Sequence, residues 1–563
     1  MKPNSLASLQ AALDHHHAGR LAEAEQLYRA VLSADANDPD ALNLLGVLEY
    51  ERGRNLEALE WLSKAVRVSP KTASFHNNLG LVFVALGRHG EAAPRFEQAG
   101  LLDARLQDAF YNLGVARQQL GHVDLAIAAY LKALSLAEEP GTLNNLGAAY
   151  RKIGRREEAI RCYERAIQLQ PDHANALFNI AIALSQTGRT TDSEIWYQQA
   201  LICYRQELMR QPTAPVCVNL AHILLGRFQF VEAEQLLRRA LELQPNHSPA
   251  FNGLGNVLLA TGRAREAVHA YDRAIELRED DPVVYYNRGL ARLLLGDFAG
   301  GWDDYEYRWL WEGFPNLRPS FAKPAWNGDD LNGRTLLVHN EQGLGDTIQF
   351  ARYVRLLAHR GARVIFGQPA ELKSLLGDLG GACQVLEANQ PLPPFDLHAE
   401  IMSLPRLCGT RLENIPASVP YLPLPPVERF PLPPATPGRL RVGLVWAGGA
   451  LLMNDALRSI SLKDFLPLLQ TADFDFFSLQ VGPRAADLAA LPVGILVTDI
   501  GSRVRDFADT AAVMRQLDLI ISVDTATLHL AGALALPAWG LLPYAPDWRW
   551  LLQREDSPWY PTL

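Results

Sequence analysis

A glycine-rich turn ending in an acidic residue, Gly343-Leu344-Gly345-Asp346, separates an apolar segment at 335–340 from a segment of helical periodicity. Glycines at such a turn let the backbone approach a substrate closely, and the carboxylate of Asp346 can point into a cleft. A carboxylate placed there can act as a general base. Plain helix capping, which Asp also favours, is the alternative interpretation. Glu341, in the same turn, is a weaker candidate base.

A second turn, Asp524-Thr525-Ala526-Thr527, follows an apolar run and opens another helical segment that contains His529. The first N–H groups of a helix lack partners and carry the positive end of its dipole, so they attract an anion at the strand end. A diphosphate would suit that position. The alternative is that Asp524 or Thr525 caps the helix while His529 packs on the sheet.

Both turns lie in a part of the chain where strands and helices alternate, which predicts parallel sheets with sites at the carboxyl ends of the strands. A Pro-rich stretch at 415–438 divides this part into two sets of elements. Strands are expected at 335–340, 363–368, 383–388 and 395–401, and then at 441–448, 474–482, 495–501, 517–524 and 537–542.

The segments VHNEQGLGDTIQFARYV (338–354) and LIISVDTATLHLAGALALP (519–537) resemble those of bacterial glycosyltransferases related to the heptosyltransferase family. They are more similar to the members fused behind tetratricopeptide repeats. The resemblance implies a GT-B fold of two Rossmann-like lobes, at 334–425 and 439–563, joined by a linker at 426–438. Related chains continue beyond the Pro-Asp-Trp-Arg-Trp stretch, so the lobe that ends at Leu563 is either trimmed or closed differently.

The resemblance also implies roles for single residues. The Asp of the family's Gly-Asp pair is the base, which assigns catalysis to Asp346, and an inverting transferase needs one such base. Arg458 stands where relatives keep a Lys or Arg that balances the charge of the leaving diphosphate. The implied donor-binding residues are Gly343, Gly345, Asn454, Arg458, Gln480, Asp524, Thr525, Ala526, Thr527 and His529.

One turn departs from the family pattern of roughly Ala-Gly-Asn-Pro followed by His. Between 448 and 453 the chain has the apolar substitutes Gly449, Ala450 and Leu452, which puts donor identity and activity in question. Asp473-Phe474-Asp475 matches the Asp-x-Asp of metal-dependent transferases, but it begins a strand and is a three-residue coincidence. No metal and no cofactor are predicted, the nucleotide-sugar being a co-substrate.

An internal repeat fills the first 315 residues. A glycine recurs at spacings of 33 or 34 residues at Gly46, Gly80, Gly114 and Gly147, and the pattern resumes at Gly255 and Gly289. That period belongs to the tetratricopeptide family, whose units are pairs of antiparallel helices. We expect about nine repeats over 1–315, the sixth lengthened and the last a cap, followed by a connector at 316–333. Stacked repeats form a superhelix with a concave groove that usually holds peptides.

A row of asparagines accompanies the repeat, two residues before its Gly or the equivalent Ala. An Asn carboxamide both donates and accepts hydrogen bonds, so a stacked row could hold an extended peptide. The row resembles the asparagine ladder of tetratricopeptide-containing protein O-GlcNAc transferases; the alternative is that each Asn only bonds the backbone of a neighbouring helix. The predicted acceptor-binding residues are Asn78, Asn112, Asn145, Asn179, Asn219 and Asn287.

Composition narrows the classes of partner and compartment. With 53 Lys+Arg against 62 Asp+Glu, a net charge of −9, the chain lacks the basic footprint of a nucleic-acid binder. Five cysteines form no CxxC pair, and the adjacent histidines His15–His17 cannot share one helical face, so neither set predicts a metal site or a disulfide framework. No export signal and no membrane span are recognised, so we expect a cytoplasmic protein.

Taken together, these patterns predict an α-solenoid followed by a two-lobed α/β transferase. The predicted activity is metal-independent, inverting transfer of a sugar from a nucleotide-sugar to Ser or Thr of a protein recruited by the repeat groove. Flagellin is a candidate acceptor by analogy with bacterial proteins of this layout. Two alternatives stay open: an interaction scaffold with an inactive transferase domain, and a transferase that acts on a saccharide or lipopolysaccharide.

Overall fold

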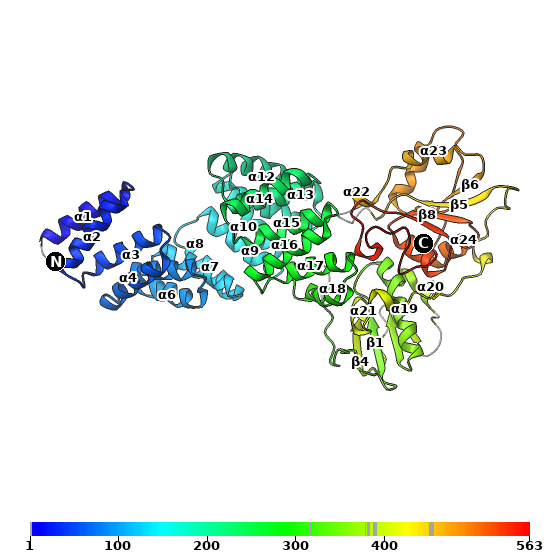
Figure 1. Cartoon of the computed structure of the whole chain (residues 1–563), viewed down its shortest axis with the longest axis horizontal. Coiled ribbons are helices and arrows are strands. Elements are labelled where there is room, and N and C mark those ends of the chain that lie inside the picture. The colour runs from blue at the N-terminus through cyan, green and yellow to red at the C-terminus, as the bar shows by residue number, and fades with distance from the viewer. Residues whose placement is uncertain are drawn as a thin grey trace. The chain divides into compact units, whose positions relative to one another are not determined.

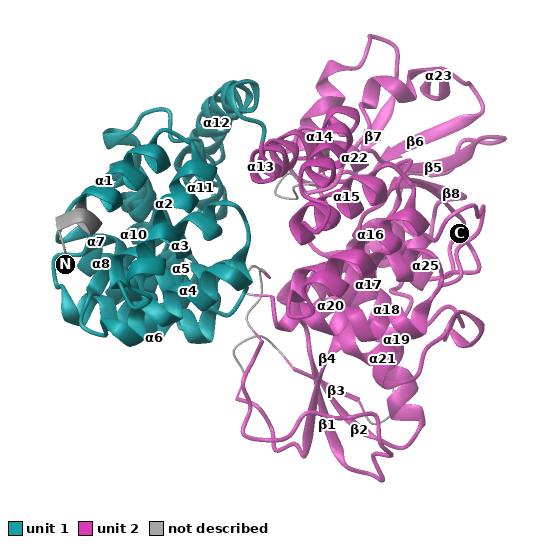
Figure 2. Ribbon diagram, turned by 60° about the vertical axis from the view of Figure 1, so that its left-hand side comes forward, with its two compact units in different colours: residues 1–212 teal, residues 213–563 magenta. Residues whose placement is uncertain are grey.

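The computed structural model of the protein describes residues 3–563 except 312–313, 315–317, 378, 380–382, 387–390 and 450–454. The chain forms two compact units, residues 1–212 and 213–563 (Figure 1, Figure 2). The first is helical, and the second combines helices with two parallel sheets. Among the described residues, no helix combines the length and the apolar character needed to span a membrane.

The first unit consists of helix pairs joined by tight turns. Its helices are α1 (Pro3–His17), α2 (Leu21–Ala34), α3 (Pro39–Glu51), α4 (Asn55–Val68), α5 (Ala73–Ala85), α6 (His89–Leu102), α7 (Gln107–Gln119), α8 (Val123–Leu134), α9 (Pro140–Lys152), α10 (Arg156–Leu169), α11 (Ala174–Gln186) and α12 (Thr190–Arg210). The turn glycines have positive φ, for example 74° at Gly53, a conformation that L side chains rarely adopt. Helix α12 has 21 residues where α10 has 14, as expected for a lengthened sixth unit.

The recurring glycine of the first helix in each pair is required by packing. A Cβ added at Gly80 would lie 2.5 Å from Cε1 of Phe96, a ring on the second helix of the same pair. A Cβ at Gly147 would lie 2.6 Å from Cε1 of Tyr163 in the same way. At Gly80, Gly114 and Gly147 the glycine and the ring therefore form one structural motif, in which the missing side chain makes room for the ring, whereas the neighbour of Gly46 is Leu62.

The same pattern continues into the second unit. Its first helices are α13 (Ala214–Leu225), α14 (Phe230–Leu243), α15 (Ser248–Ala260), α16 (Ala264–Leu277), α17 (Pro282–Leu294) and α18 (Phe298–Tyr305). Here a Cβ at Gly255 would lie 2.4 Å from Cε1 of Tyr271. The helix pairs thus extend to Tyr305, just before the α/β part of the chain.

The α/β part has two sheets in which every strand pair is parallel, as the sequence predicts. The first sheet has the order β3-β2-β1-β4 and the second β7-β6-β5-β8-β9. The strands are β1 (Thr335–His339), β2 (Arg363–Gly367), β3 (Cys383–Leu386), β4 (Leu397–Glu400), β5 (Leu440–Val445), β6 (Phe474–Ser478), β7 (Val497–Asp499), β8 (Leu519–Val523) and β9 (Ala538–Leu541). The helices are α19 (Leu344–His359), α20 (Lys373–Leu376), α21 (Leu404–Leu407), α22 (Asp455–Arg458), α23 (Leu466–Leu469), α24 (Phe507–Met514) and α25 (Ala526–Ala533).

The last helix pair and the α/β part share one hydrophobic core. Trp302 of α18 packs edge-on against Trp548 with ring centroids 5.2 Å apart, and Phe298 stacks on Trp559 at 5.9 Å. The same core contains residues of both sheets, such as Val338 of β1 and Ile520 of β8. The C-terminal segment also reaches α19, since the Arg352 guanidinium donates to the Trp559 carbonyl at 2.7 Å.

Candidate functional site

The two sequence turns singled out for chemistry meet at the N-terminal ends of α19 and α25. Gly345, in the first turn of α19, is so close to α25 that a Cβ there would lie 2.9 Å from Cδ2 of His529 and 3.5 Å from Cα of Ala526. Helix α19 follows β1 and α25 follows β8, and both strands are inner strands of their sheets. Asp346 and the segment 524–529 therefore lie in one place, although nearly 180 residues separate them in sequence.

Asp346 makes two different contacts. One carboxylate oxygen accepts the Gly343 backbone N–H at 2.9 Å, so the capping interpretation of this residue is correct. The other accepts a hydrogen bond from the guanidinium of Arg549. Burial raises the pKa of Asp346 above its usual range, while Arg549 opposes the shift. The two contacts fix the position of the carboxylate, and each oxygen keeps a further lone pair that could accept a proton.

Arg549 is the functional candidate to which the sequence assigned no role. Its buried guanidinium also donates to Asp547 and to the Gln349 side chain, at 2.7 and 2.8 Å, and stacks over the Trp548 ring at 4.2 Å. The Asp-Trp-Arg-Trp stretch is the only signal of Arg549 in the sequence, and it does not predict which residue the arginine pairs with. The arrangement places one cation between two carboxylates, those of Asp346 and Asp547.

A second set of charges surrounds the end of β8. Asp524 lies 3.6 Å from Arg458 and 3.9 Å from the Nε2 of His529. Burial raises the pKa of Asp524 to about 6, and Asp547 adds to the shift while Arg458 opposes it. Three of the predicted donor-binding residues are thus brought together by the fold.

His529 is buried and neutral. Burial lowers its pKa well below the usual value, and the nearby cations Arg549 and Arg352 act in the same direction. Its Nδ1 lies 2.9 Å from the Tyr560 hydroxyl, and its ring stacks on Trp550 at 5.4 Å. The His529 side chain thus packs against the C-terminal segment and not on the sheet, and its role in donor binding stays a prediction.

The start of α25 has the properties of an anion site. Thr525 occupies the N-cap position with extended backbone, but its side chain makes no capping bond to the helix. Its hydroxyl lies instead 3.1 Å from Ser522 Oγ. Thr525, Ala526 and Thr527 are only half-buried. Half-buried N–H groups at a helix start, beside Arg458, are suited to a phosphate.

Two other predicted donor-binding residues have different places. The Gln480 carboxamide accepts the N–H groups of Trp446 and Ala447 at 3.1 and 2.9 Å and donates to two carbonyl groups, those of Ala447 and Val481. Gln480 therefore holds the backbone that follows β5 in position. Asn454 lies outside the described residues, as does most of the turn at 448–453.

Glu341 is committed to an ion pair. Its carboxylate contacts the fully buried Arg308 at 3.0 Å and accepts the Met402 backbone N–H at 3.0 Å. Burial raises the pKa of Glu341 to about 7, and Arg308 opposes the shift. Because Arg308 follows α18, this pair ties the end of the helical array to the first sheet. Glu341, the weaker candidate base, is thus held in a structural ion pair.

The remaining charged motifs of the sequence have protein partners. Asp475 of the Asp-x-Asp motif lies 3.2 Å from Arg439, and a hydrogen bond from Thr436 lowers its pKa. In the triple-histidine segment, the His16 nitrogens lie 3.1 Å from the Tyr28 hydroxyl and 3.0 Å from Glu51.

The asparagine row forms hydrogen bonds between successive helix pairs. Asn78 donates to the Asn43 carboxamide oxygen at 3.0 Å, and the same contact recurs from Asn112 to Asn77, Asn179 to Asn144 and Asn287 to Asn252. Asn145 donates instead to the Tyr111 hydroxyl. These five carboxamides therefore bond a side chain of the preceding helix pair, and not the helix backbone that the alternative interpretation named, and peptide binding stays a prediction. All six predicted residues, Asn219 included, are half-buried.

Comparison with known proteins identifies the helical part. The family described as tetratricopeptide repeat matches residues 107–140, 138–206 and 213–244, and the TPR repeat family matches 46–87 and 255–296. The helix pairs are tetratricopeptide repeats. The solved structure of MamA is 28% identical over 28% of this chain and 92% of that chain, with a TM-score of 0.27.

Among full-length relatives, Protein FlbA of Caulobacter vibrioides is 26% identical over 497 residues, covering 82% of this chain and 81% of FlbA. Protein O-mannosyl-transferase TMTC3 of Homo sapiens is 29% identical over 40% of this chain. The probable UDP-N-acetylglucosamine peptide N-acetylglucosaminyltransferase SPINDLY of Hordeum vulgare is 27% identical over 21%. The chain spans only 25% of TMTC3 and 13% of SPINDLY.

Proposed function

We propose that the protein is a metal-independent glycosyltransferase of the two-lobed GT-B type that acts on a protein acceptor. The observation that carries the proposal is the meeting of α19 and α25, which places a carboxylate, two arginines and an uncapped helix start together. The names of TMTC3 and SPINDLY, both transferases that act on proteins or peptides, support the same class of reaction.

The donor diphosphate would bind at the start of α25. The half-buried N–H groups of 525–527 offer hydrogen bonds, and Arg458 supplies a positive charge that is now balanced by Asp524 at 3.6 Å. At that distance the two side chains make no direct hydrogen bond, so the Arg458 guanidinium keeps donors to offer a phosphate. The charge that develops on the leaving diphosphate would then be stabilised in place.

The acceptor hydroxyl would be activated by Asp346. Its carboxylate takes the proton, the acceptor oxygen bonds to the anomeric carbon of the sugar, and the bond from that carbon to the phosphate oxygen breaks with inversion. Burial raises the pKa of Asp346, which makes it a stronger base than an exposed Asp. Arg549 keeps the carboxylate oriented and ionised.

The acceptor protein would be held by the repeats. In the described hydrogen bonds, Asn78, Asn112 and Asn179 each use one N–H on the preceding helix pair. The second N–H and the oxygen of each carboxamide are then available to a peptide backbone. We propose Ser and Thr hydroxyls as the acceptor groups, and flagellin as the first protein to test.

A nucleotide-binding assay tests this function directly. UDP, GDP, ADP and CMP are added to the full chain, and the melting temperature is compared with that of Arg458→Ala and of a control variant, Arg484→Ala, whose partner Asp487 lies on the same short segment. A nucleotide at 100 times its Kd should stabilise the chain by about 2.7 kcal/mol. We expect a shift with one nucleotide that only Arg458→Ala loses.

Transfer itself is then measured with the matching nucleotide-sugar, by mass spectrometry of the acceptor. Asp346→Asn keeps the Gly343 cap and should bind nucleotide but fail to transfer. If no nucleotide shifts the melting temperature, the transferase proposal is wrong and the interaction-scaffold alternative replaces it. Modification of a protein acceptor should drop in Asn145→Ala and Asn179→Ala, whereas a saccharide transferase that modifies no protein would be unaffected by these changes.

A further inference from the structure

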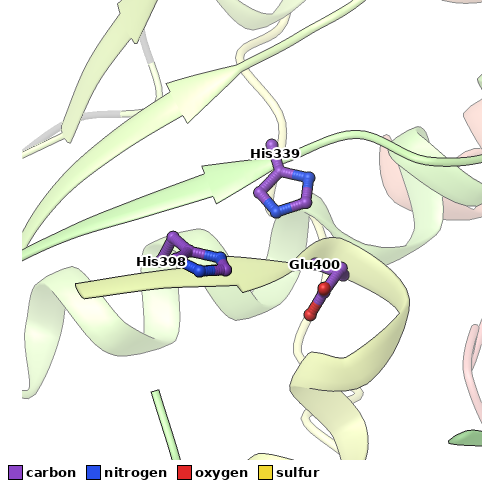
Figure 3. Close-up of side chains that lie close together, drawn as sticks. All are labelled: His339, His398 and Glu400. Atoms are coloured by element: carbon purple, nitrogen blue, oxygen red, sulfur yellow. The ribbon is translucent and has the colours of Figure 1, made fainter. Parts of the chain in front are cut away.

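Two histidines and a glutamate lie together at the edge of the first sheet, on a face that the proposed mechanism does not use. His339 ends β1, while His398 and Glu400 lie on the neighbouring strand β4 (Figure 3). In the parallel register His339 is the partner of Glu400, and His398 is two residues earlier on the same strand. Alternation along a strand therefore places all three side chains on one face of the sheet.

The three side chains can reach a common centre. One ligand atom from each residue lies within 4.8 Å of the other two, and all three residues are buried, with 8%, 6% and 2% of His339, His398 and Glu400 exposed. A tetrahedral zinc ion with bonds of about 2.0–2.1 Å holds its ligands about 3.4 Å apart. Small side-chain rotations would bring the three ligand atoms to that spacing.

The imidazoles have ligand atoms to offer. Within the described residues, neither ring nitrogen of His339 and not the Nδ1 of His398 has a hydrogen-bond partner, although these atoms are buried. Buried polar atoms without partners are costly and indicate a missing ion or water. A ring nitrogen without a hydrogen bond can bind a metal through its lone pair, so both histidines can serve as ligands.

The residues around this cluster resemble those that surround and orient the ligands of a metal site. Arg318 donates to one oxygen of Glu400 at 2.7 Å, and a ligating carboxylate commonly has such a partner. The Phe321 ring lies 4.7 Å from the His398 ring and 5.3 Å from that of His339, which keeps water away from the cluster. The His398 backbone is fixed as well, because its carbonyl accepts the Trp326 N–H at 2.8 Å.

We propose that His339, His398 and Glu400 bind a divalent transition-metal ion, zinc being the first to test. A set of two imidazoles and one carboxylate suits borderline ions such as Zn²⁺ better than the hard ions Mg²⁺ and Ca²⁺. The ion would join β1, β4 and the segment 318–326, and so would hold the connector from the repeats against the first sheet. This role is structural and separate from the metal-independent transfer proposed above.

The test is zinc binding by the full chain after removal of metal with a chelator and of any affinity tag. Calorimetry and elemental analysis should find one zinc ion per chain, and added zinc should raise the melting temperature. His398→Gln and Glu400→Gln should each weaken binding at least tenfold. The controls, the exposed His359→Gln and the double variant His15→Gln/His17→Gln, should bind zinc like the unmodified chain.

Cobalt substitution gives an independent readout that needs no variant. Bound Co²⁺ should show visible absorption without a thiolate charge-transfer band, because no cysteine belongs to the cluster. The proposal is wrong if the unmodified chain binds no zinc, if the zinc is lost with His15 and His17, or if folded His398→Gln retains it. A variant that fails to fold leaves the result on the unmodified chain decisive.

Discussion

Replacing Arg549 should destabilise the second unit strongly, and the reason lies in its partners. The guanidinium is 9% exposed and is shared between Asp346 and Asp547. In Arg549→Gln two carboxylates face each other without a cation, and breaking a buried ion pair from one side costs about 3–5 kcal/mol. Asp346→Asn leaves Arg549 paired with Asp547 and loses one charged hydrogen bond, about 1.5–3 kcal/mol.

Urea unfolding of the two single variants and of the double variant measures these free energies. The double variant Asp346→Asn/Arg549→Gln should be more stable than Arg549→Gln alone, because the uncompensated charge is gone. The loss in Arg549→Gln should also depend on pH. Without the cation, burial keeps the pKa of Asp346 above its unfolded value, so the variant should lose stability as pH rises from about 4 toward neutrality.

The reasoning is refuted if the double variant is no more stable than Arg549→Gln, or if the loss in Arg549→Gln is the same at pH 4 and pH 8. Either result would mean that the residue contributes through its packing on Trp548 and Phe350 and not through its charge. Arg554→Gln, whose guanidinium pairs with the exposed Asp556, is the matched control and should change stability by less than about 1 kcal/mol.

Three further outcomes are expected. Gly345→Ala should lower both the melting temperature and nucleotide binding, because its methyl group would overlap His529. Gly80→Ala should cost about 1–3 kcal/mol in urea unfolding through overlap with the ring of the paired helix. Hydrogen bonds from Arg505 lower the pKa of Asp509 to about 2, so this carboxylate should contribute about 2–3 kcal/mol that is lost as pH falls from about 4 through 2; Asp509→Asn should flatten that part of the stability profile.

Each outcome has its own check. A Cβ at Gly90 meets nothing within 4 Å, so Gly90→Ala should be neutral or stabilising, and equal losses at Gly80 and Gly90 would contradict the overlap argument. If Gly345→Ala bound nucleotide as the unmodified chain does, the contact between α19 and α25 would not be needed for donor binding. A constant stability difference between Asp509→Asn and the unmodified chain at pH 7 and pH 2 would contradict the pKa shift.

The features that local sequence predicts well are those set by short-range spacing. The repeat glycines recur because several helix pairs make the same close contact, with an aromatic ring at Gly80, Gly114, Gly147 and Gly255, so one period predicts much of the rest. The nine strands follow from apolar runs between turn residues, and each expected strand has a counterpart in the structure. Asp346 could be singled out because it lies in the first turn of the helix that follows β1, and Asp524 because it directly follows β8.

The features that the sequence does not predict depend on distant contacts. Nothing near Arg549 indicates that it pairs with a residue 203 positions away. The cluster of His339, His398 and Glu400 is hidden for the same reason, since strand order brings β4 beside β1. For Gln480 the sequence instead suggests a role that the fold does not need. A Gln can bind a ligand, but the surrounding backbone uses the hydrogen bonds of this carboxamide.

The shared core at α18 determines how this chain can be divided. A truncation that begins at residue 334, where the α/β part starts, would remove Phe298 and Trp302 and leave the faces of Trp548 and Trp559 in water. Exposed apolar surface of this kind favours aggregation. A fragment meant to retain the site near Asp346 therefore has to begin at about residue 213, the start of the second compact unit, and to carry the last repeats with it.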